Sequence, residues 1–294
     1  MHGNYKKYQI GSFSVTRVFE KSSTAGSPQY LLPDWTPAAA KKHEHWLIPG
    51  SMGENHEYLI RSIHTWVIKT DRHTILVDAG IGNDKERPHI PAFHRLASSY
   101  LDRLQAVGVT PEDVDYVFLT HLHADHVGWN TRLVDGTWVP TFPNARYVFS
   151  QAEDAAFAKK TDGNEINDGV YEDSVLPIIK AGLADRVIPD GSPYLEGIAL
   201  HSAPGHSMGH MAISLTSQGE QALFGGDVMH HPLQVYYPEW NSCFCENAQL
   251  ARTSRRWLLD YAAERRAILF SGHFAESSAG VVRKNGHDFQ WEFL

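Results

Sequence analysis

The sequence has little cysteine and no long apolar run. Cys243 and Cys245 are the only cysteines in 294 residues, and two thiols one residue apart cannot build a disulfide framework or a four-cysteine zinc site. The first residues lack the apolar stretch of a secretory signal, and no segment approaches the roughly 18 consecutive apolar residues that suggest a membrane span. These absences predict a cytoplasmic protein without a membrane partner. An exported protein whose signal has been removed would show the same absences.

Basic charge is also scarce. Lysine and arginine number 26 against 34 aspartates and glutamates, which gives a formal net charge of −8. A nucleic-acid-binding protein normally carries the opposite charge, so we expect no nucleic-acid partner. The apolar content of 42% and aromatic content of 11% predict a folded globular chain. The length fits one large domain or two small ones, and we expect a single domain over residues 1–294. The aromatic and proline content of residues 1–50 predicts that they form an ordered N-terminal arm.

Several segments carry secondary-structure patterns. An amphipathic helix is predicted over residues 91–107, because apolar side chains recur there every three to four positions. Thr110 followed by Pro111 is a typical helix start. Strands are predicted over 13–19, 64–69 and 74–77, and further helices over 151–160, 173–184 and 246–265. The rest of the chain up to Gly50 looks irregular. Strands interleaved with helices favour an α/β or α+β sandwich.

Histidine is the residue in excess, with 18 in the chain. It is the commonest metal ligand in proteins. Short apolar runs, which we expect to be strands, lead repeatedly into a histidine or an aspartate. These runs are residues 116–120 before His121, 197–200 ahead of His206, 222–224 ahead of Asp227 and 267–270 ahead of His273. Ligand-type residues just past strand ends can converge on one edge of a sheet, where loops carry function.

The densest motif runs from His121 to His126 and reads His-Leu-His-Ala-Asp-His. His121 and His123 are one residue apart, so in extended backbone their rings point the same way and can hold one metal. Asp125 and His126 follow on a turn and can face a second metal. Nitrogen and oxygen ligands without thiolate suit zinc, manganese, iron, cobalt or nickel, and zinc is the best single expectation.

This motif resembles the signature of the metallo-β-lactamase superfamily. Further segments resemble the remaining motifs of that family in the expected order: residues 74–80 with Asp-x-Gly, 204–210 with Pro-Gly-His, 224–227 with Gly-Gly-Asp, and 271–273 with Ser-Gly-His. The resemblance runs from about Ser62 to His273. It implies an α+β fold, the four-layer αββα sandwich in which helices flank two mixed β-sheets.

The resemblance also implies a centre of two divalent metal ions. One ion would be held by His121, His123 and His206, and the other by Asp125, His126 and His273, with Asp227 bridging them. Two carboxylates allow two cations to lie close together, about 3.5–4 Å apart in such sites. A hydroxide bridging the ions would attack the carbonyl of a lactone or ester. Asp125 is also a candidate general acid for the leaving alkoxide.

The bridging carboxylate narrows the expected reaction. β-Lactamases of the superfamily generally lack it, so Asp227 favours lactonases, arylesterases, phosphotriesterases and thioesterases. The pattern is most similar to N-acyl homoserine lactone lactonases, the quorum-quenching enzymes, and to methyl-parathion-hydrolase-like enzymes. We therefore expect a lactonase or arylesterase that acts on a small-molecule substrate, and a homodimer is the expected assembly. The alternatives are an organophosphate triester hydrolase and a non-catalytic metal-binding protein.

His230 departs from the lactonase pattern. Quorum-quenching lactonases tend to carry a tyrosine three residues after the bridging aspartate, and this chain has a histidine there. A histidine can donate the same hydrogen bond to a substrate carbonyl or carry a proton, so His230 joins Asp125 and Asp227 as a catalytic candidate. The alternative is a supporting or merely exposed side chain. His210 is expected to support the loop of His206.

Overall fold

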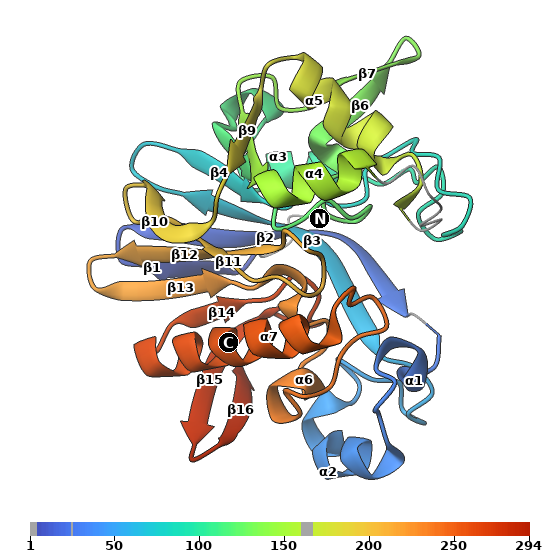
Figure 1. Ribbon diagram of the computed structural model, residues 1–294, viewed down its shortest axis with the longest axis vertical. Coiled ribbons are helices and arrows are strands. Elements are labelled where there is room, and N and C mark those ends of the chain that lie inside the picture. The colour runs from blue at the N-terminus through green and yellow to red at the C-terminus, as the bar shows by residue number, and fades with distance from the viewer. Residues whose placement is uncertain (1–4, 25, 160–166) are drawn as a thin grey trace. The chain divides into compact units, whose positions relative to one another are not determined.

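The structure, a computed structural model, describes residues 5–24, 26–159 and 167–294 of the chain. The chain divides into two compact units. Their helices and strands are labelled in Figure 1. The first unit comprises Met1–Glu20 and Ile63–Pro189, and the second comprises Lys21–Ser62 and Asp190–Leu294. Among the described residues, no helix has the length and apolar character that a membrane crossing requires. The expected cytoplasmic location stays a prediction.

A seven-stranded mixed sheet forms the framework of the first unit. Its order is β1 (Lys7–Ile10), β2 (Phe13–Thr24), β3 (Ile60–Lys69), β4 (Thr74–Val77), β5 (Tyr116–Phe118), β8 (Arg146–Ser150) and β9 (Ala184–Val187). The run from β4 to β9 is parallel, whereas β1 with β2 and β3 with β4 pair antiparallel. Parallel strands are typically covered on both faces, which explains the continuous apolar sequences of β4 and β8.

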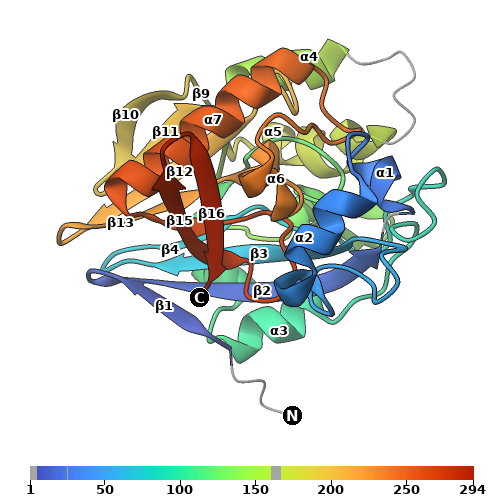
Figure 2. The same cartoon turned by 90° about the horizontal axis from the view of Figure 1, so that it is seen from below.

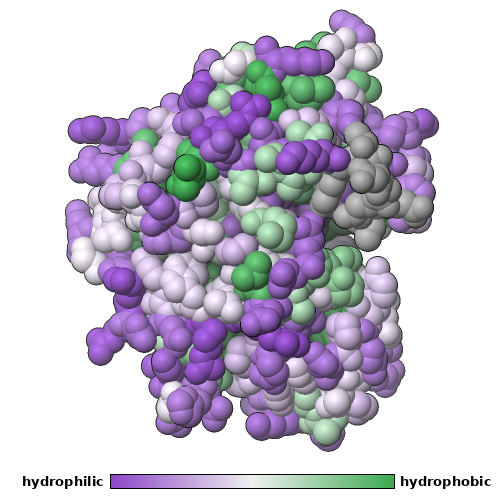
Figure 3. All heavy atoms as spheres, viewed as in Figure 1, coloured by the Kyte–Doolittle hydropathy of each residue, from purple (hydrophilic) through white to green (hydrophobic). Residues whose placement is uncertain are grey.

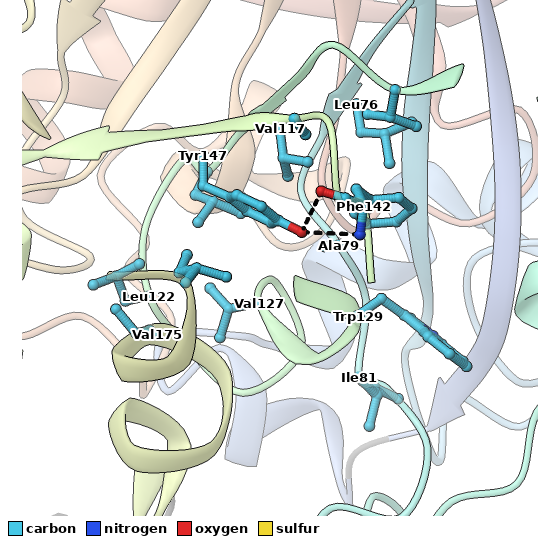
Figure 4. Packing of buried hydrophobic residues seen from close by; sticks show 14 of the residues in the cluster. Leu76, Ala79, Ile81, Val117, Leu122, Val127, Trp129, Phe142, Tyr147 and Val175 are labelled. Atoms are coloured by element: carbon cyan, nitrogen blue, oxygen red, sulfur yellow. Dashed lines mark hydrogen bonds between the residues drawn. The ribbon is translucent and has the colours of Figure 1, made fainter. Parts of the chain in front are cut away.

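Shorter elements complete the first unit. They are α3 (Tyr100–Ala106), η1 (Pro111–Asp113), η2 (Gly128–Asn130), the hairpin β6 (Thr131–Val134) and β7 (Thr137–Pro140), α4 (Gln151–Lys159), the π-helix η4 (Tyr171–Val175) and α5 (Leu176–Lys180). Figure 4 shows part of the apolar core on which they pack. There the Tyr147 hydroxyl lies 3.1 Å from the amide nitrogen of Phe142, whose N–H it accepts. This core supports the loops that leave the ends of β4 and β5.

A second seven-stranded sheet belongs to the second unit. Its order is β10 (Asp190–Leu195), β11 (Ile198–Ser202), β12 (Met211–Ser217), β13 (Glu220–Phe224), β14 (Ile268–Phe270), β15 (Ala279–Asn285) and β16 (Asp288–Phe293). Only β13 and β14 pair parallel, and the long helix α7 (Ala248–Arg265) connects them. Figure 2 shows α7 lying along this sheet, and its buried Leu258, Leu259 and Ala262 pack against strand residues. The short η5 (Gly226–Val228) and α6 (Leu233–Tyr236) follow β13.

The prediction that the rest of the chain up to Gly50 is irregular is wrong in part. Besides β1 and the longer β2, this region contains α1 (Pro28–Leu31) and α2 (Pro37–Leu47). The Thr36 side chain accepts a hydrogen bond from the amide of Ala39, and Pro37 follows it as the first helical residue. This pair is a recognised helix start. The assignment of residues 1–50 as an arm stays a prediction.

The long helix expected over residues 91–107 is also wrong, because only α3 is helical. The preceding residues form a loop closed by the Asn83 side chain, which pairs with both backbone groups of Ser98. Buried Lys85 anchors this loop by donating from Nζ to Thr131 Oγ1, 2.6 Å away. Tertiary bonds thus override the apolar periodicity.

Two other predicted helices are shorter than expected or differ in helix type. The start at Thr110 leads only to the single turn η1, closed by reciprocal bonds between Thr110 and Asp113. The segment 173–184 is split into η4 and α5, since a new helix begins at Leu176 with Pro177 in its first turn, and Ala184 already belongs to β9. The remaining predicted helices and strands are confirmed. The helices are α4 and α7, and the strands are β2, β3, β4, β5, β11, β13 and β14. Residue 160 lies outside the described residues.

Two mixed sheets with helices confirm the predicted α+β class. On the face in Figure 3, hydrophilic residues cover most of the surface and hydrophobic residues lie in smaller groups among them. The exposed large apolar side chains include Leu133 and Val134 of the hairpin β6–β7. Scattered exposed apolar residues of this kind are normal on a protein surface.

Candidate metal centre

The loop after β5 carries the histidine-rich motif of the first unit. His121 and His126 are buried, whereas His123 and Asp125 are half-buried. The His121 ring centroid lies 4.4 Å from that of His123 and 4.1 Å from that of His126. Asp125 Oδ1 lies 3.7 Å from His126 Nε2. The structure therefore brings together the four ligand-type residues that the sequence singled out in this segment.

Asp78 fixes the orientation of this motif. It follows β4 in a left-handed conformation, with φ of 59°. Its carboxylate accepts the Thr120 N–H at 2.8 Å and lies 2.9 Å from His126 Nδ1, while the Thr120 hydroxyl lies 3.0 Å from His121 Nδ1. A carboxylate on Nδ1 fixes the tautomer of a histidine and leaves Nε2 as the ligand atom. Asp78 therefore presents His126 in the form that a metal requires.

The backbone of the loop is held from distant parts of the first unit. Glu153 Oε1 accepts the Leu122 N–H and Asn167 Oδ1 accepts the Ala124 N–H, both at 3.2 Å. A Cβ on Gly128 would lie 1.7 Å from the carbonyl oxygen of Ile81, so only glycine fits this approach. Sequence reasoning missed Glu153 and Asn167, because nothing near them in the chain marks a supporting role.

In the second unit, three histidines surround the carboxylate of Asp227. The Nε2 atoms of His273 and His230 lie 3.1 and 3.2 Å from its oxygens. His206 Nε2 lies 3.4 Å away. All four side chains are buried. The ligand atoms of His206, Asp227 and His230 lie within 4.8 Å of one another. Three residues predicted as ligands thus meet, although they come from separate loops.

Strand pairing and specific hydrogen bonds produce this convergence. Because β13 and β14 are adjacent and parallel, the loops carrying Asp227 and His273 leave the sheet at the same edge. His273 Nδ1 lies 3.0 Å from the carbonyl oxygen of Ser62, to which it donates, so that Nε2 points to Asp227. His210 Nε2 accepts the backbone N–H of Asp227 at 3.0 Å. His210 therefore supports Asp227 directly.

The loop of His206 depends on a close approach to α7. Gly205 has φ of 130°, and a Cβ there would lie 2.0 Å from the amide nitrogen of Ala251. Its own amide donates to the carbonyl of Ser207, and the amide of Asn247 donates to the Gly205 carbonyl. Asn247 also caps α7 through its side chain. The glycine in the Pro-Gly-His motif is thus a packing requirement.

His230 is a buried member of this cluster. Its side chain is 1% exposed, which excludes the exposed alternative. Gln234 Oε1 accepts its backbone N–H at 2.7 Å, and its ring centroid lies 4.9 Å from that of His206. Burial lowers the pKa of His230 to about 4, although Asp227 opposes the shift. The ring is therefore neutral near pH 7 and offers one donor and one acceptor nitrogen.

The donor chemistry of both clusters fits a divalent metal. Each consists of histidine nitrogens and aspartate oxygens without thiolate, which is the set preferred by zinc and its neighbours in the transition series. A carboxylate enclosed by three buried imidazoles supplies negative charge where a cation would need it. The roles of the individual ligands stay predictions.

Comparison with known proteins gives a consistent result. Residues 60–273 match the metallo-beta-lactamase superfamily. An N-acyl homoserine lactonase of Bacillus cereus is 23% identical over 228 residues, which cover 73% of this chain and 82% of the relative. Among solved structures, AbOPH, a hydrolase in the beta-lactamase superfamily, has a TM-score of 0.81 at 23% identity, covering 99% of this chain and 97% of its own. AidC, a dizinc quorum-quenching lactonase solved with the product N-hexanoyl-L-homoserine, has a TM-score of 0.78 at 20% identity, with the same two coverages.

Proposed function

The chain belongs to the metallo-β-lactamase superfamily of hydrolases, and we propose that it hydrolyses lactones or aryl esters at a centre of two divalent metal ions. The observation that carries this proposal is the buried Asp227 carboxylate with three imidazole nitrogens 3.1–3.4 Å from its oxygens. The lactonase of Bacillus cereus and the dizinc lactonase AidC support the substrate class. A small lactone or ester is thus the proposed partner.

The proposed ligands are those carried over from the sequence, with Asp227 shared between the ions. They are His121, His123, Asp125 and His126 of the first unit and His206, Asp227 and His273 of the second. Bound divalent ions would lower the pKa of a coordinated water from 15.7 toward about 7 and polarise the substrate carbonyl. We favour zinc, with manganese, iron, cobalt or nickel as the alternatives.

The side chains contribute charge and orientation. Asp227 supplies a negative charge in a buried environment, and Asp78 and the Ser62 carbonyl hold His126 and His273 with Nε2 available. Neutral His230 can donate its single N–H to an oxygen on which negative charge develops. Half-buried Asp125 is the proposed general acid that returns a proton to the leaving alkoxide.

Metal removal tests this function. We expect chelator dialysis to abolish hydrolysis of a panel of lactones and aryl esters, and zinc readdition to restore it. His273→Ala should lose metal by elemental analysis, whereas His287→Ala, a change at an exposed histidine outside the cluster, should keep it. Hydrolysis that persists in metal-free protein contradicts the proposal. A protein that holds two ions and hydrolyses nothing on the panel supports the non-catalytic alternative.

A phosphotriester is the second candidate substrate. It is favoured by His230, which stands where quorum-quenching lactonases tend to carry a tyrosine and which is buried against Asp227. The kcat/KM values for a paraoxon-like triester and for a lactone discriminate the two. If lactones are the natural class, wild type prefers the lactone. If triesters are the natural class, the wild type prefers the triester, and His230→Tyr shifts the ratio of the two kcat/KM values toward the lactone.

A further inference from the structure

Among the described residues, three arginines have buried side chains: Arg61, Arg87 and Arg255. In two of them the guanidinium has hydrogen-bond partners, although Nε of Arg87, like that of Arg61, is buried without one. Arg87 forms a two-pronged ion pair with Asp173, with nitrogen–oxygen distances of 2.7 and 2.8 Å. Arg255 donates to the carbonyls of Val228 and Pro238 at 3.0 and 2.7 Å. This is the expected pattern, because a buried cation is costly unless it is paired or hydrogen-bonded.

Arg61 lacks such partners. It is 7% exposed, its Nε is buried without a hydrogen bond, and its guanidinium pairs with no carboxylate in the described ranges 5–24, 26–159 and 167–294. The guanidinium carbon lies 5.5 Å from the ring centroid of Phe244. The Arg61 guanidinium is therefore buried without an ion-pair partner among the described residues.

Arg61 is adjacent to the histidine cluster of the second unit. Its backbone forms a bridge with Phe274, the residue after His273. Phe244, on which its guanidinium lies, has its own ring centroid 5.8 Å from that of His230. After burial, the positive charge of Arg61 contributes to lowering the pKa values of both His230 and His231 to about 4. The contacts and the electrostatics agree that Arg61 lies beside His230.

We propose that Arg61 forms an anion subsite next to the candidate metal centre and binds a carboxylate carried by the substrate. The substrates would then be lactones or esters that bear a second, ionised carboxyl group away from the bond that is cleaved. The planar guanidinium matches a carboxylate through two parallel hydrogen bonds, and half-buried Phe244 supports its face. The substrate class rests on the proposed function, whereas anion binding by Arg61 does not.

Calorimetry tests the subsite without catalysis. On the metal-loaded enzyme, we expect glutarate, a dicarboxylate, to bind at least about tenfold more tightly than monomethyl glutarate, which has one carboxylate blocked. Arg61→Gln should bring this ratio close to one, and Arg61→Lys should keep part of it. Arg283→Gln, which removes an exposed arginine paired with Glu292, is the matched control and should keep the full ratio. An unchanged ratio in Arg61→Gln, or no preference in the wild type, overturns the proposal.

Thermal unfolding separates a binding role from a structural one. Arg61→Gln should keep or raise the melting temperature, because it removes a buried charge that lacks a partner. Arg255→Gln should lower it, because the Val228 and Pro238 carbonyls lose their donor. Glutarate should raise the melting temperature of the wild type but not of Arg61→Gln. If Arg61→Gln destabilises the protein as much as Arg255→Gln does, Arg61 is structural and the proposal fails.

Kinetics connects the subsite to the substrate. Two p-nitrophenyl esters are compared, one ending in a free carboxylate and the other in its methyl ester. We expect the ratio of their kcat/KM values to favour the free carboxylate in the wild type and to fall about tenfold or more in Arg61→Gln, mainly through KM. Hydrolysis with no preference for the anionic ester contradicts the substrate class. Failure of the wild type to hydrolyse either ester contradicts the proposed function, and glutarate binding then still decides on the subsite.

Discussion

The two units present their ligand-type side chains in different ways. In the first, His121, His123, Asp125 and His126 lie within six consecutive positions. A side-chain network that starts at Asp78 orients the rings of His121 and His126. In the second, residues from separate loops surround one carboxylate. A local motif needs an external support to orient it, whereas a dispersed cluster depends on strand pairing to assemble at all.

The difference also concerns charge. Asp78 is hydrogen-bonded to Thr120 and to Nδ1 of His126, so it supports the first cluster without occupying the ligand atom Nε2. Asp227 lies among the ring nitrogens themselves. We therefore expect loss of the central carboxylate to be more damaging than loss of the supporting one.

The largest effect is expected for Asp227→Ala. Without the carboxylate, the second cluster loses its only negative charge, and the proposed bridge between the ions disappears. We expect loss of one ion and a decrease in kcat on the order of 100-fold or more, measured by elemental analysis and steady-state kinetics. Asp288→Ala, at an exposed position of β16, is the control. Two retained ions with normal turnover would refute the contrast between the two aspartates.

An intermediate effect is expected for Asp78→Asn. The amide keeps the shape of the side chain but no longer carries the charge that stabilises the His126 Nδ1–H donor. Supporting residues of this kind typically contribute 10–100-fold to metal affinity, and we expect a loss in that range from a competition titration with a chelating dye. Asp71→Asn, at an exposed turn, should leave the affinity unchanged. An unchanged affinity in Asp78→Asn would mean that the local motif orients itself.

The smallest effect is expected for His230→Gln. If the neutral ring donates one hydrogen bond to the substrate, its loss should lower kcat roughly two- to tenfold, with both ions retained. Loss of an ion in this variant would instead identify His230 as a ligand, consistent with its place in the donor group of His206 and Asp227. Full turnover with both ions bound would remove His230 from the mechanism.

The ability to predict this site from sequence follows the same division. The motif from His121 to His126 could be interpreted directly, because its members are neighbours in the chain. His206, Asp227 and His273 were identified through strand ends and through resemblance to the family, and the structure brings them to one point. Their supports could not be predicted, since the Ser62 carbonyl contacts His273 across 211 positions. Arg61 gave no signal for a comparable reason, because an arginine in a strand does not reveal whether an acid faces it.

The fold shows the same limit. Strands and the helix α7 were predicted closely, since period and capping are local properties. The helix expected over residues 91–107 was too long, because Asn83, Lys85 and Ser98 close a loop through bonds that only the folded chain provides. The predicted α+β class does not depend on such long-range bonds, and the two mixed sheets with helices confirm it.

The parallel pairing of β13 and β14 has a consequence for the order of folding. Asp227 and His273 are 46 positions apart, and the whole of α7 lies in the chain between their strands. Contacts between distant residues form slowly because the intervening chain must be ordered first. The ligand-type residues from His121 to His126 are already neighbours in the chain, although the contact with Asp78 that orients His126 also spans 48 positions. A nascent chain that meets a metal ion is therefore expected to capture it first at the local motif, and to complete the dispersed cluster only as folding ends.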